Sequence, residues 1–518
     1  METFAAFARS ICVLGAACLG LAPVLGIAED SEGQAGIHVV AQLVQKSPIP
    51  DPKKSDYEDC LYTAQVKVLQ ITSKARVPRD LILILPAFTK RALQPESKYE
   101  EGSVIEADLL PHEKADKDRR TMQRSDLLDR FDLHAFDALS SRLSTHSAAS
   151  FPSRSDDYFE AAPAEEKAHP AEAAPVHYPS SERAAAERKA AMDHDRETIA
   201  SALKAHGGSW EKWQDEVSPM LTDLVKQIDA SKEKALRKNN LFYLGPHLND
   251  YKQLGLQLQA DDCPPVRVLK FLSKQLRERG IDLIVVPFPY REDVIADSFS
   301  THAPSDGWFV PQRMHFIQKL LEADVEVIDL VQPLRAGLAR YPVVFHDTVD
   351  QHPCDGGVQV AADEIAKRLA RYEVEKPSPA LKFNLKQVTY SDNDRQYAAT
   401  AVTTEKGEPL DVPENAGSPF IVMGDSFSRT PDYHPGGEGA AIPMHVAYRL
   451  GVVPDYLGAM GNSDKVMRLL ARQGGNYLAN RKAVVFVFAP NRLFGAESYS
   501  KRGGTWNLVD LPPLPIER

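Results

Sequence analysis

The stretch PFIVMGDSFS, residues 419–428, joins an apolar run to a turn that carries a serine. An apolar, β-branched run of this length is typical of a strand buried on both faces of a parallel sheet. Gly424 permits a tight turn, which leaves Ser426 at the carboxyl end of the strand, where open α/β sheets carry their active sites. Gly, Asp and Ser are ordinary turn residues, so it is the position after a buried strand that makes Ser426 a candidate nucleophile.

The same alternation of strand and helix continues on both sides of this stretch. Short apolar runs that predict buried strands lie at 281–288, 325–331 and 482–490. Between them, apolar residues recur with helical spacing at 266–279, 311–322, 358–372, 439–450 and 463–473. Residues 239–518 are therefore predicted to form a three-layer α/β domain around a parallel sheet.

The chain before this domain has three differently composed parts. Residues 35–140 contain alternating stretches such as VKVLQI and predict a small all-β domain, with one short amphipathic helix at 127–139. Residues 141–182 are rich in Ser, Ala, Pro and Glu and predict a linker. Residues 183–238 predict a helical spacer, solvated in its first part and packed on the next domain in its second.

The first residues are typical of an export signal. Arg9 precedes an uncharged apolar stretch at 10–28 that ends in Gly26-Ile27-Ala28, where a signal peptidase needs small residues. Residues 1–28 are thus predicted to be a signal peptide, and the protein to be periplasmic or secreted. The length of the stretch leaves open an uncleaved segment that anchors the chain in a membrane.

Removal of this segment would leave three cysteines, Cys60, Cys263 and Cys354. An odd number permits at most one internal disulfide in an oxidising compartment. Cys263 and Cys354 are the favoured partners because both are expected in loops of one domain, and three unpaired thiols are the alternative.

The composition limits the classes of function. A chain of 518 residues with 43% hydrophobic residues is long enough for two or three domains. Its formal net charge of -11 gives no general attraction to nucleic acid, and its basic residues are interspersed with acidic ones. A role in nucleic-acid binding is therefore not expected.

A second candidate stretch, FHDTVDQHPCDGG, occupies residues 345–357 and leads into a helical pattern. A hydroxyl nucleophile needs a base within hydrogen-bonding distance, and the base needs a carboxylate that orients it. Asp350 and His352 lie two positions apart and could supply these groups to Ser426. The alternative is the start of a helix that Asp355 caps, with a histidine that only faces solvent.

The acidic and histidine side chains of this stretch are also potential metal ligands. His346, Asp347, Asp350 and His352 crowd into one short segment, and no distant cluster completes a coordination sphere. The sequence predicts neither a metal centre nor a cofactor.

Residues 350–362, DQHPCDGGVQVAA, resemble the D-x-H-W-N-x-x-G-x-x-x-A-A block of the alginate-acetylation proteins of the AlgX/AlgJ type, a branch of the SGNH superfamily. In that branch the Asp/His block precedes the G-D-S-F-S block, as it does here. Further stretches at 284–291, 327–330 and 485–492 are similar to other blocks of the family. The resemblance implies an SGNH-like fold over residues 239–495.

The resemblance also implies a function. Ser426 would attack an acyl ester, His352 would act as the base and Asp350 would orient it, with Gly461 and Asn491 as candidate oxyanion donors. The protein would be an O-acetyltransferase or an esterase that acts on acetyl groups of a carbohydrate polymer. Its expected partners are that polymer and a membrane acetyl donor or a polysaccharide-export machinery.

Two departures from the family pattern lie beside the expected base. Pro353 stands where the family has Trp, and Cys354 where it has Asn. They motivate the alternative of a non-catalytic protein that keeps the fold to bind or assemble a polysaccharide.

Four further side chains are candidates for contact with a substrate, against the alternative of ordinary packing or surface positions. They are Tyr290, Arg291, Arg429 and Arg492.

Overall fold

The computed structural model divides the chain into residues 1–36 and a unit from Ile37 to Arg518. The structure describes residues 37–513 except for 54, 56, 73–76, 132, 152–180, 233–234, 239–240, 245–262, 301–310, 342–343, 347–351, 375–380, 393–394, 415–416, 461–462, 491–492 and 494–505. The expected signal peptide, residues 1–28, lies outside the described residues, as does most of the expected linker. Among the described helices, none is long and apolar enough to cross a membrane.

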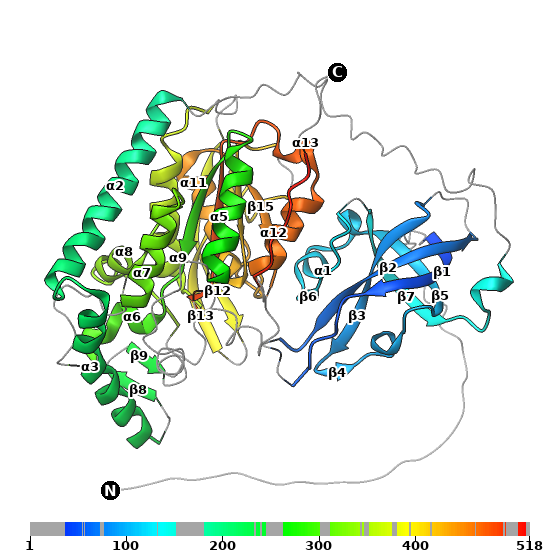
Figure 1. Ribbon diagram of the computed structural model, residues 1–518, viewed down its shortest axis with the longest axis horizontal. Coiled ribbons are helices and arrows are strands. Elements are labelled where there is room, and N and C mark those ends of the chain that lie inside the picture. Colours follow the sequence, from blue (N-terminus) through cyan, green and yellow to red (C-terminus); the bar gives the residue numbers. More distant parts are fainter. Residues whose placement is uncertain are drawn as a thin grey trace, which may run out of the picture. The chain divides into compact units, whose positions relative to one another are not determined.

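A five-stranded sheet forms the centre of the carboxyl-terminal half (Figure 1). Its order is β11 (Glu326–Val327), β10 (Asp282–Pro287), β16 (Ala483–Phe488), β14 (Phe420–Gly424) and β15 (Asp455–Gly458). Every pair of neighbours runs parallel. Because β14 lies between two other strands, the serine that follows it emerges from the interior of the sheet and not from its edge.

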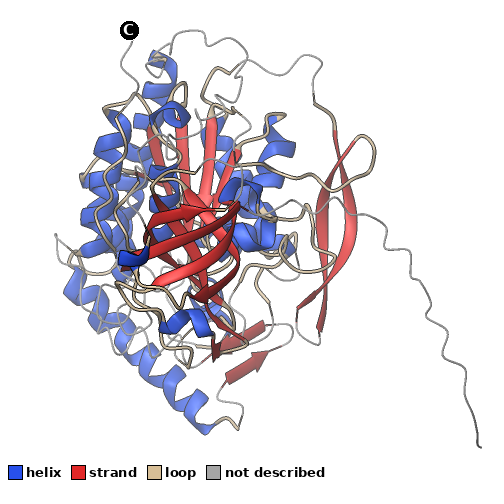
Figure 2. Cartoon of the chain, turned by 90° about the vertical axis from the view of Figure 1, so that its right-hand side faces the viewer, coloured by secondary structure: helices blue, strands red, loops and turns tan. Residues whose placement is uncertain are grey.

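Helices cover both faces of this sheet (Figure 2). The longer ones are α5 (Pro264–Arg277), α7 (Pro311–Glu322), α9 (Asp355–Leu369), α11 (Ile442–Leu450) and α12 (Ser463–Arg472). Short helices lie at α6 (Arg291–Ile295), α8 (Val331–Gly337), α10 (Ser426–Arg429) and α13 (Gly475–Leu478). The α/β fold class predicted from the sequence is confirmed.

One element of this half was not predicted. Strands β12 (Phe383–Asp392) and β13 (Arg395–Thr404) pair antiparallel as a long hairpin between α9 and β14. Most residues of β12 and of the first half of β13 are exposed or only partly buried. Exposed positions need not be apolar, so the apolar periodicity that indicated the other elements is weak in this hairpin. Its buried part, which includes Tyr390 and Ala399, packs with Ala440, and the Tyr390 hydroxyl contacts His346.

The amino-terminal part is a β-rich domain, as expected. It consists of β1 (Ile37–Lys46), β2 (Cys60–Ile71), β3 (Asp80–Thr89), β4 (Ala92–Leu93), β5 (Val104–Pro111), β6 (Arg124–Ser125) and β7 (Ala135–Leu143), with a short helix α1 (Lys117–Thr121). The strand order β3-β7-β5-β1-β2 closes on itself because β2 also pairs with β3. The sheet is thus a small closed barrel.

The helix predicted at 127–139 is wrong. Residues from Ala135 onward form β7, which pairs with both β3 and β5. Apolar spacing over so short a segment fits a helix or a strand, and the two neighbouring strands decide in favour of the strand.

Two helices, α2 (Glu182–Ala205) and α3 (Trp210–Ala230), precede a two-stranded sheet of β8 (Ala235–Lys238) and β9 (Leu241–Leu244). The interpretation of the first helix as solvated is wrong. Met192 and Ile199 of α2 are buried in the core of the α/β domain. Arg188 of α2 also donates hydrogen bonds to Asp324. Polar contacts thus fix a helix whose apolar face is narrow.

The three cysteines described, Cys60, Cys263 and Cys354, are buried, and none of them forms a disulfide. The favoured Cys263–Cys354 disulfide is therefore wrong, and the alternative without this disulfide is the one found.

The buried side chain of His445 makes the stability of the folded chain depend on pH. It is fully buried in α11, where Nε2 donates a hydrogen bond to the Thr400 carbonyl at 2.7 Å. Burial, with the Arg449 guanidinium beside the ring, lowers the pKa of His445 from 6.5 to about 4. His445 is therefore protonated below about pH 6.5 in the unfolded chain but only below about pH 4 in the folded chain. Because the unfolded chain binds the additional proton between these values, the stability of the folded chain falls as the pH drops from 6.5 to 4.

The amide of His445→Gln can still donate to Thr400 but does not titrate. When the pH is lowered from 7 to 4, we therefore expect the unfolding free energy of this variant to fall by about 3 kcal/mol less than that of the wild type. Urea unfolding at both pH values measures the difference. Equal losses in the two proteins would contradict this account.

Candidate functional site

The turn after β14 places Ser426 at the first position of α10. Gly424 is required there, because a Cβ at this position would overlap the Val487 carbonyl oxygen and lie 2.7 Å from the Ser428 side chain. The sheet and the helix consequently approach each other more closely than any residue with a side chain would allow.

Asp425 holds this turn in place. One carboxylate oxygen accepts a hydrogen bond from the Phe427 N–H at 3.0 Å and caps α10, while the other accepts from the Ala489 N–H at 2.9 Å. Asp425 is 1% exposed, so both bonds lie away from competing water. One side chain thus ties the serine turn to the end of the neighbouring strand β16.

His352 lies on a loop that folds back before α9. Phe345 and Pro353 form a β-bridge across it. Gly357, in the first turn of α9, permits the close approach, since a Cβ there would overlap the Val344 carbonyl oxygen. In the Gly356-Gly357 pair of the sequence, glycine is therefore required on steric grounds at Gly357.

The structure brings the two candidate residues together. Nε2 of His352 lies 2.8 Å from Oγ of Ser426, within hydrogen-bonding distance. The imidazole ring also packs against Phe427, with ring centroids 4.8 Å apart. Ser426 is 6% exposed, so the hydroxyl is screened from bulk water yet still reachable. A hydroxyl and an imidazole in this geometry can form an activated nucleophile.

The remaining candidate residues have different outcomes. Asp350, Gly461, Asn491 and Arg492 lie outside the described residues, so their roles stay predictions.

The described substrate candidates are all buried. Tyr290 is 1% exposed and is the N-cap residue of α6. Arg291 donates a hydrogen bond to the His346 carbonyl, on the loop that carries His352. Arg429 is 3% exposed, and its Nε lies 3.5 Å from the Asp432 carboxylate. Arg291 and Arg429 therefore contact the framework of the site, and contact with a substrate remains a prediction for each.

Cys354, the departure beside the base, lies at the amino terminus of α9 and is buried. Burial raises the pKa of its thiol to about 12. The thiol is therefore neutral at physiological pH and is not itself a nucleophile. Pro353 takes part in the β-bridge, and neither residue prevents the contact between His352 and Ser426.

Sequence reasoning missed two features of the site. Asp425 was read only as a turn residue, although a carboxylate directly before a candidate nucleophile at a helix start was a signal for capping. It also missed the group in which His346 contacts Tyr390 and stacks on Tyr397, with ring centroids 4.4 Å apart. Both tyrosines belong to the hairpin β12–β13, which no apolar periodicity indicated.

The described part of the chain contains no group of three or more His, Cys, Asp or Glu side chains that could hold a metal ion. The chemistry of the described site is that of the Ser426 hydroxyl and the His352 imidazole.

These features define an SGNH-like domain: a parallel sheet between helices, a serine at the end of a central strand, and a histidine from an earlier segment of the chain that contacts this serine. Residues 257–418 match the family described as SGNH hydrolase-like domain, acetyltransferase AlgX, and this match supports the AlgX/AlgJ-type branch. The recognition from sequence is confirmed, and so is the expectation of an enzyme class that works by acyl transfer. Among curated proteins, none matches the chain.

Solved structures similar to this chain carry related descriptions. The O-acetyltransferase domain of Pseudomonas putida AlgJ is 18% identical, with 45% of this chain and 84% of that chain covered and a TM-score of 0.36. Pseudomonas aeruginosa AlgX is 14% identical, with 51% and 67% covered and a TM-score of 0.34. Bacillus cereus PatB1 with a sulfonyl adduct is 14% identical, with 51% and 96% covered and a TM-score of 0.33.

Proposed function

We propose that this protein is an exported serine acyltransferase that moves acetyl groups to or from a carbohydrate polymer. The observation that carries the proposal is the 2.8 Å contact between Ser426 Oγ and His352 Nε2. It is supported by the match of residues 257–418, which include His352, to an acetyltransferase family. The proposed location is the periplasm or the exterior, which rests on the apolar stretch at 10–28.

The chemistry follows from the two side chains. His352 takes the Ser426 proton as Oγ attacks the acyl carbonyl, and it returns the proton to the leaving oxygen. The acyl-serine formed in this way then reacts with a second hydroxyl, which His352 deprotonates in turn. Asp350 is proposed to orient the imidazole, and Gly461 and Asn491 to donate to the oxyanion.

The acceptor decides between the two named activities. Water as acceptor gives an esterase, whereas a sugar hydroxyl gives an O-acetyltransferase. The acetyltransferase family favours the sugar hydroxyl. The proposed partners are the polymer and a membrane acetyl donor or export machinery that supplies acetyl groups.

A sulfonyl fluoride tests the nucleophile without knowledge of the natural substrate. We expect phenylmethylsulfonyl fluoride to modify the peptide that contains Ser426, and the modification to be absent from Ser426→Ala and at least 100-fold slower in His352→Ala, since the base contributes about that factor or more. Peptide mass spectrometry identifies the modified residue and its rate of formation.

Acetyl transfer from p-nitrophenyl acetate to soluble oligosaccharides distinguishes the activities, because a transferase gives acetylated sugar and an esterase gives acetate. If the wild type bound polysaccharide but was neither labelled nor active, the non-catalytic binding protein expected as the alternative would replace this proposal.

A further inference from the structure

A groove of about 740 Å³ runs along the outer face of α5 and belongs to no part of the site described above. Four cations line it, Arg267, Lys270, Lys274 and Arg277, together with the apolar side chains of Phe271 and Leu508. The spacing of the cations places them on one face of the helix along about 15 Å.

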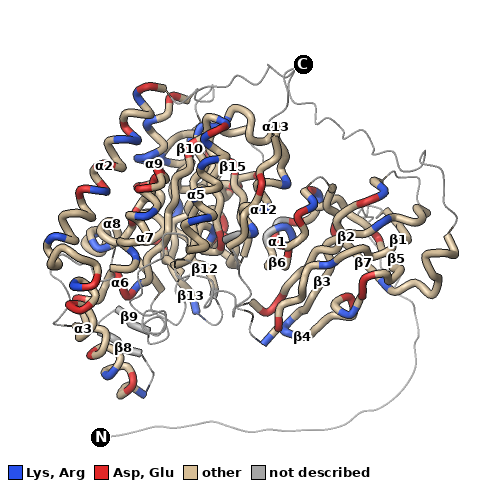
Figure 3. Tube along the Cα trace, viewed as in Figure 1, with Lys and Arg blue, Asp and Glu red and all other residues tan. Residues whose placement is uncertain are grey.

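The cations of this groove are exposed. Arg277 pairs with Asp324 at 2.5 Å, and Lys274 lies 3.9 Å from Glu278. Neither Arg267 nor Lys270 has a carboxylate partner among the described residues. Figure 3 shows Lys and Arg recurring along α5. The chain has a net charge of -11 and as a whole repels anions, but this row of cations attracts them locally.

The carboxyl-terminal segment holds an apolar side chain beside these cations. The Gln275 amide donates a hydrogen bond to the Val509 carbonyl at 2.9 Å and accepts one from the Leu511 N–H at 2.7 Å. Trp506, Val509 and Leu511 are buried, whereas Leu508 is 48% exposed. The bonds to Gln275 fix the backbone just after Leu508, and buried Trp506 precedes it, so Leu508 is held toward solvent.

We propose that this groove binds the anionic head groups of a lipid bilayer surface. Arg267 and Lys270 would pair with phosphates, while Leu508 and Phe271 would enter the boundary between head groups and acyl chains. A soluble polyanion would be attracted by the cations but would gain little from exposed Leu508. Two cations without a carboxylate partner in the described part of the chain, together with an apolar side chain held beside them, therefore favour a lipid surface. The proposal does not depend on acyl transfer.

Sedimentation with vesicles tests this proposal. The chain from Ile37 to Arg518 is suited to it, because this stretch forms a compact unit and lacks the amino-terminal apolar segment. We expect binding to vesicles of phosphatidylglycerol and phosphatidylcholine mixed at about 1 to 2, weakening with added salt, and no binding to pure phosphatidylcholine.

The double variant Arg267→Gln/Lys270→Gln should partition about 30-fold more weakly, since each cation near an anionic surface contributes about fivefold. The matched control, Lys386→Gln/Lys406→Gln, changes the net charge equally at two exposed positions on and beside the hairpin β12–β13, and it should bind as the wild type does. Leu508→Ser should weaken binding without changing its salt dependence.

Equal losses in the two double variants would overturn the proposal, because net charge alone would then explain the binding. Retention on immobilised polygalacturonate without any vesicle binding would likewise overturn it, in favour of an acidic polymer as the occupant.

Discussion

Replacing Ser426 with alanine is expected to lower kcat/KM for acetyl transfer from p-nitrophenyl acetate on the order of 10⁴-fold or more. The variant loses the atom proposed to form the acyl-enzyme and keeps the turn that presents it. That turn depends on Gly424 and on the two bonds of Asp425, neither of which involves the Ser426 hydroxyl. Circular dichroism and the melting temperature should therefore match the wild type.

His352→Ala should lose activity to a similar degree, and the double variant should lose little more than either single one. Residues that act as one unit are non-additive in this way. Additive losses would mean that Ser426 and His352 act in separate steps, against the 2.8 Å contact between them.

Ser428 is the matched control for Ser426, two positions away in the same short helix. Its hydroxyl donates a hydrogen bond to the Asp425 carbonyl at 2.7 Å and lies 2.9 Å from the Tyr456 hydroxyl. Ser428→Ala should keep most of the activity and lose about 1–2 kcal/mol of stability, because buried Tyr456 is left without that partner. Loss of activity from Ser428→Ala with full retention in Ser426→Ala would reverse the assignment of the nucleophile.

The parts of the fold that the sequence predicted are those in which apolar residues alone decide the structure. Residues 311–322 were predicted as a helix and are α7 with the same bounds. The strands β10, β14 and β16 are buried on both faces and read as continuous apolar runs. The hairpin β12–β13 and the strand β7 depend on pairing with segments distant in sequence, which periodicity does not register.

The same distinction between local patterns and contacts distant in sequence applies to the candidate site. Ser426 and His352 could be predicted because each follows or precedes an element with a clear pattern, and the order of the two blocks carried a resemblance. The supports of the site could not. The bond from Asp425 to Ala489 and the contact of Arg291 with the His346 carbonyl join residues more than 50 positions apart. Such contacts exist only once the sheet is assembled.

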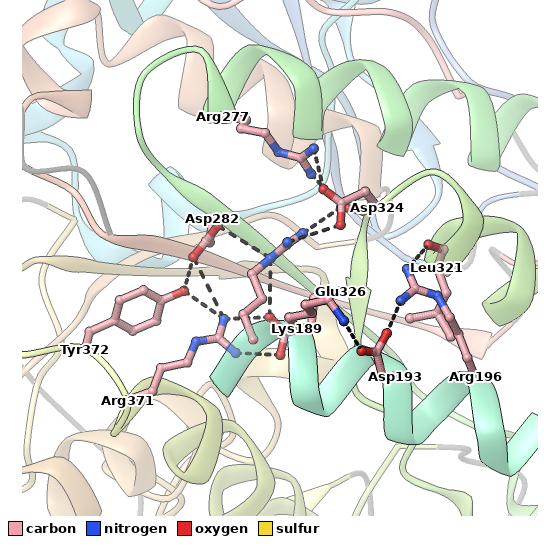
Figure 4. A network of polar contacts seen from close by, with 11 residues as sticks. Lys189, Asp193, Arg196, Arg277, Asp282, Leu321, Asp324, Glu326, Arg371 and Tyr372 are labelled. Atoms are coloured by element: carbon pink, nitrogen blue, oxygen red, sulfur yellow. Dashed lines mark hydrogen bonds and ion pairs between the residues drawn. The ribbon is translucent and has the colours of Figure 1, made fainter. Parts of the chain in front are cut away.

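Glu326 is where a single substitution is expected to cost the most stability. It is fully buried on β11, and its carboxylate accepts hydrogen bonds from Arg371 at 2.8 Å and 2.5 Å (Figure 4). Arg368 lies 3.4 Å from the same carboxylate, and Arg188 of α2 lies 4.0 Å away. Three guanidinium groups thus share the Glu326 carboxylate, although each also has Asp195, Asp282 or Asp324 within 4.0 Å, and Glu326 joins α2 and α9 to the edge of the sheet.

Glu326→Gln keeps the shape of the side chain and removes its charge, so that among the described residues buried Arg371 keeps only the Asp282 carboxylate, 4.0 Å away. We expect a loss of about 3–5 kcal/mol of unfolding free energy, measured by urea unfolding at pH 7. Glu322→Gln makes the same chemical change at an exposed pair with Lys319 and should cost less than about 0.5 kcal/mol. Adding Arg371→Met to Glu326→Gln should recover at least about 1 kcal/mol, because the poorly compensated buried charge is then gone. If that second substitution instead deepened the loss, the hydrogen bond between Arg371 and the Tyr372 hydroxyl would be the stronger contribution.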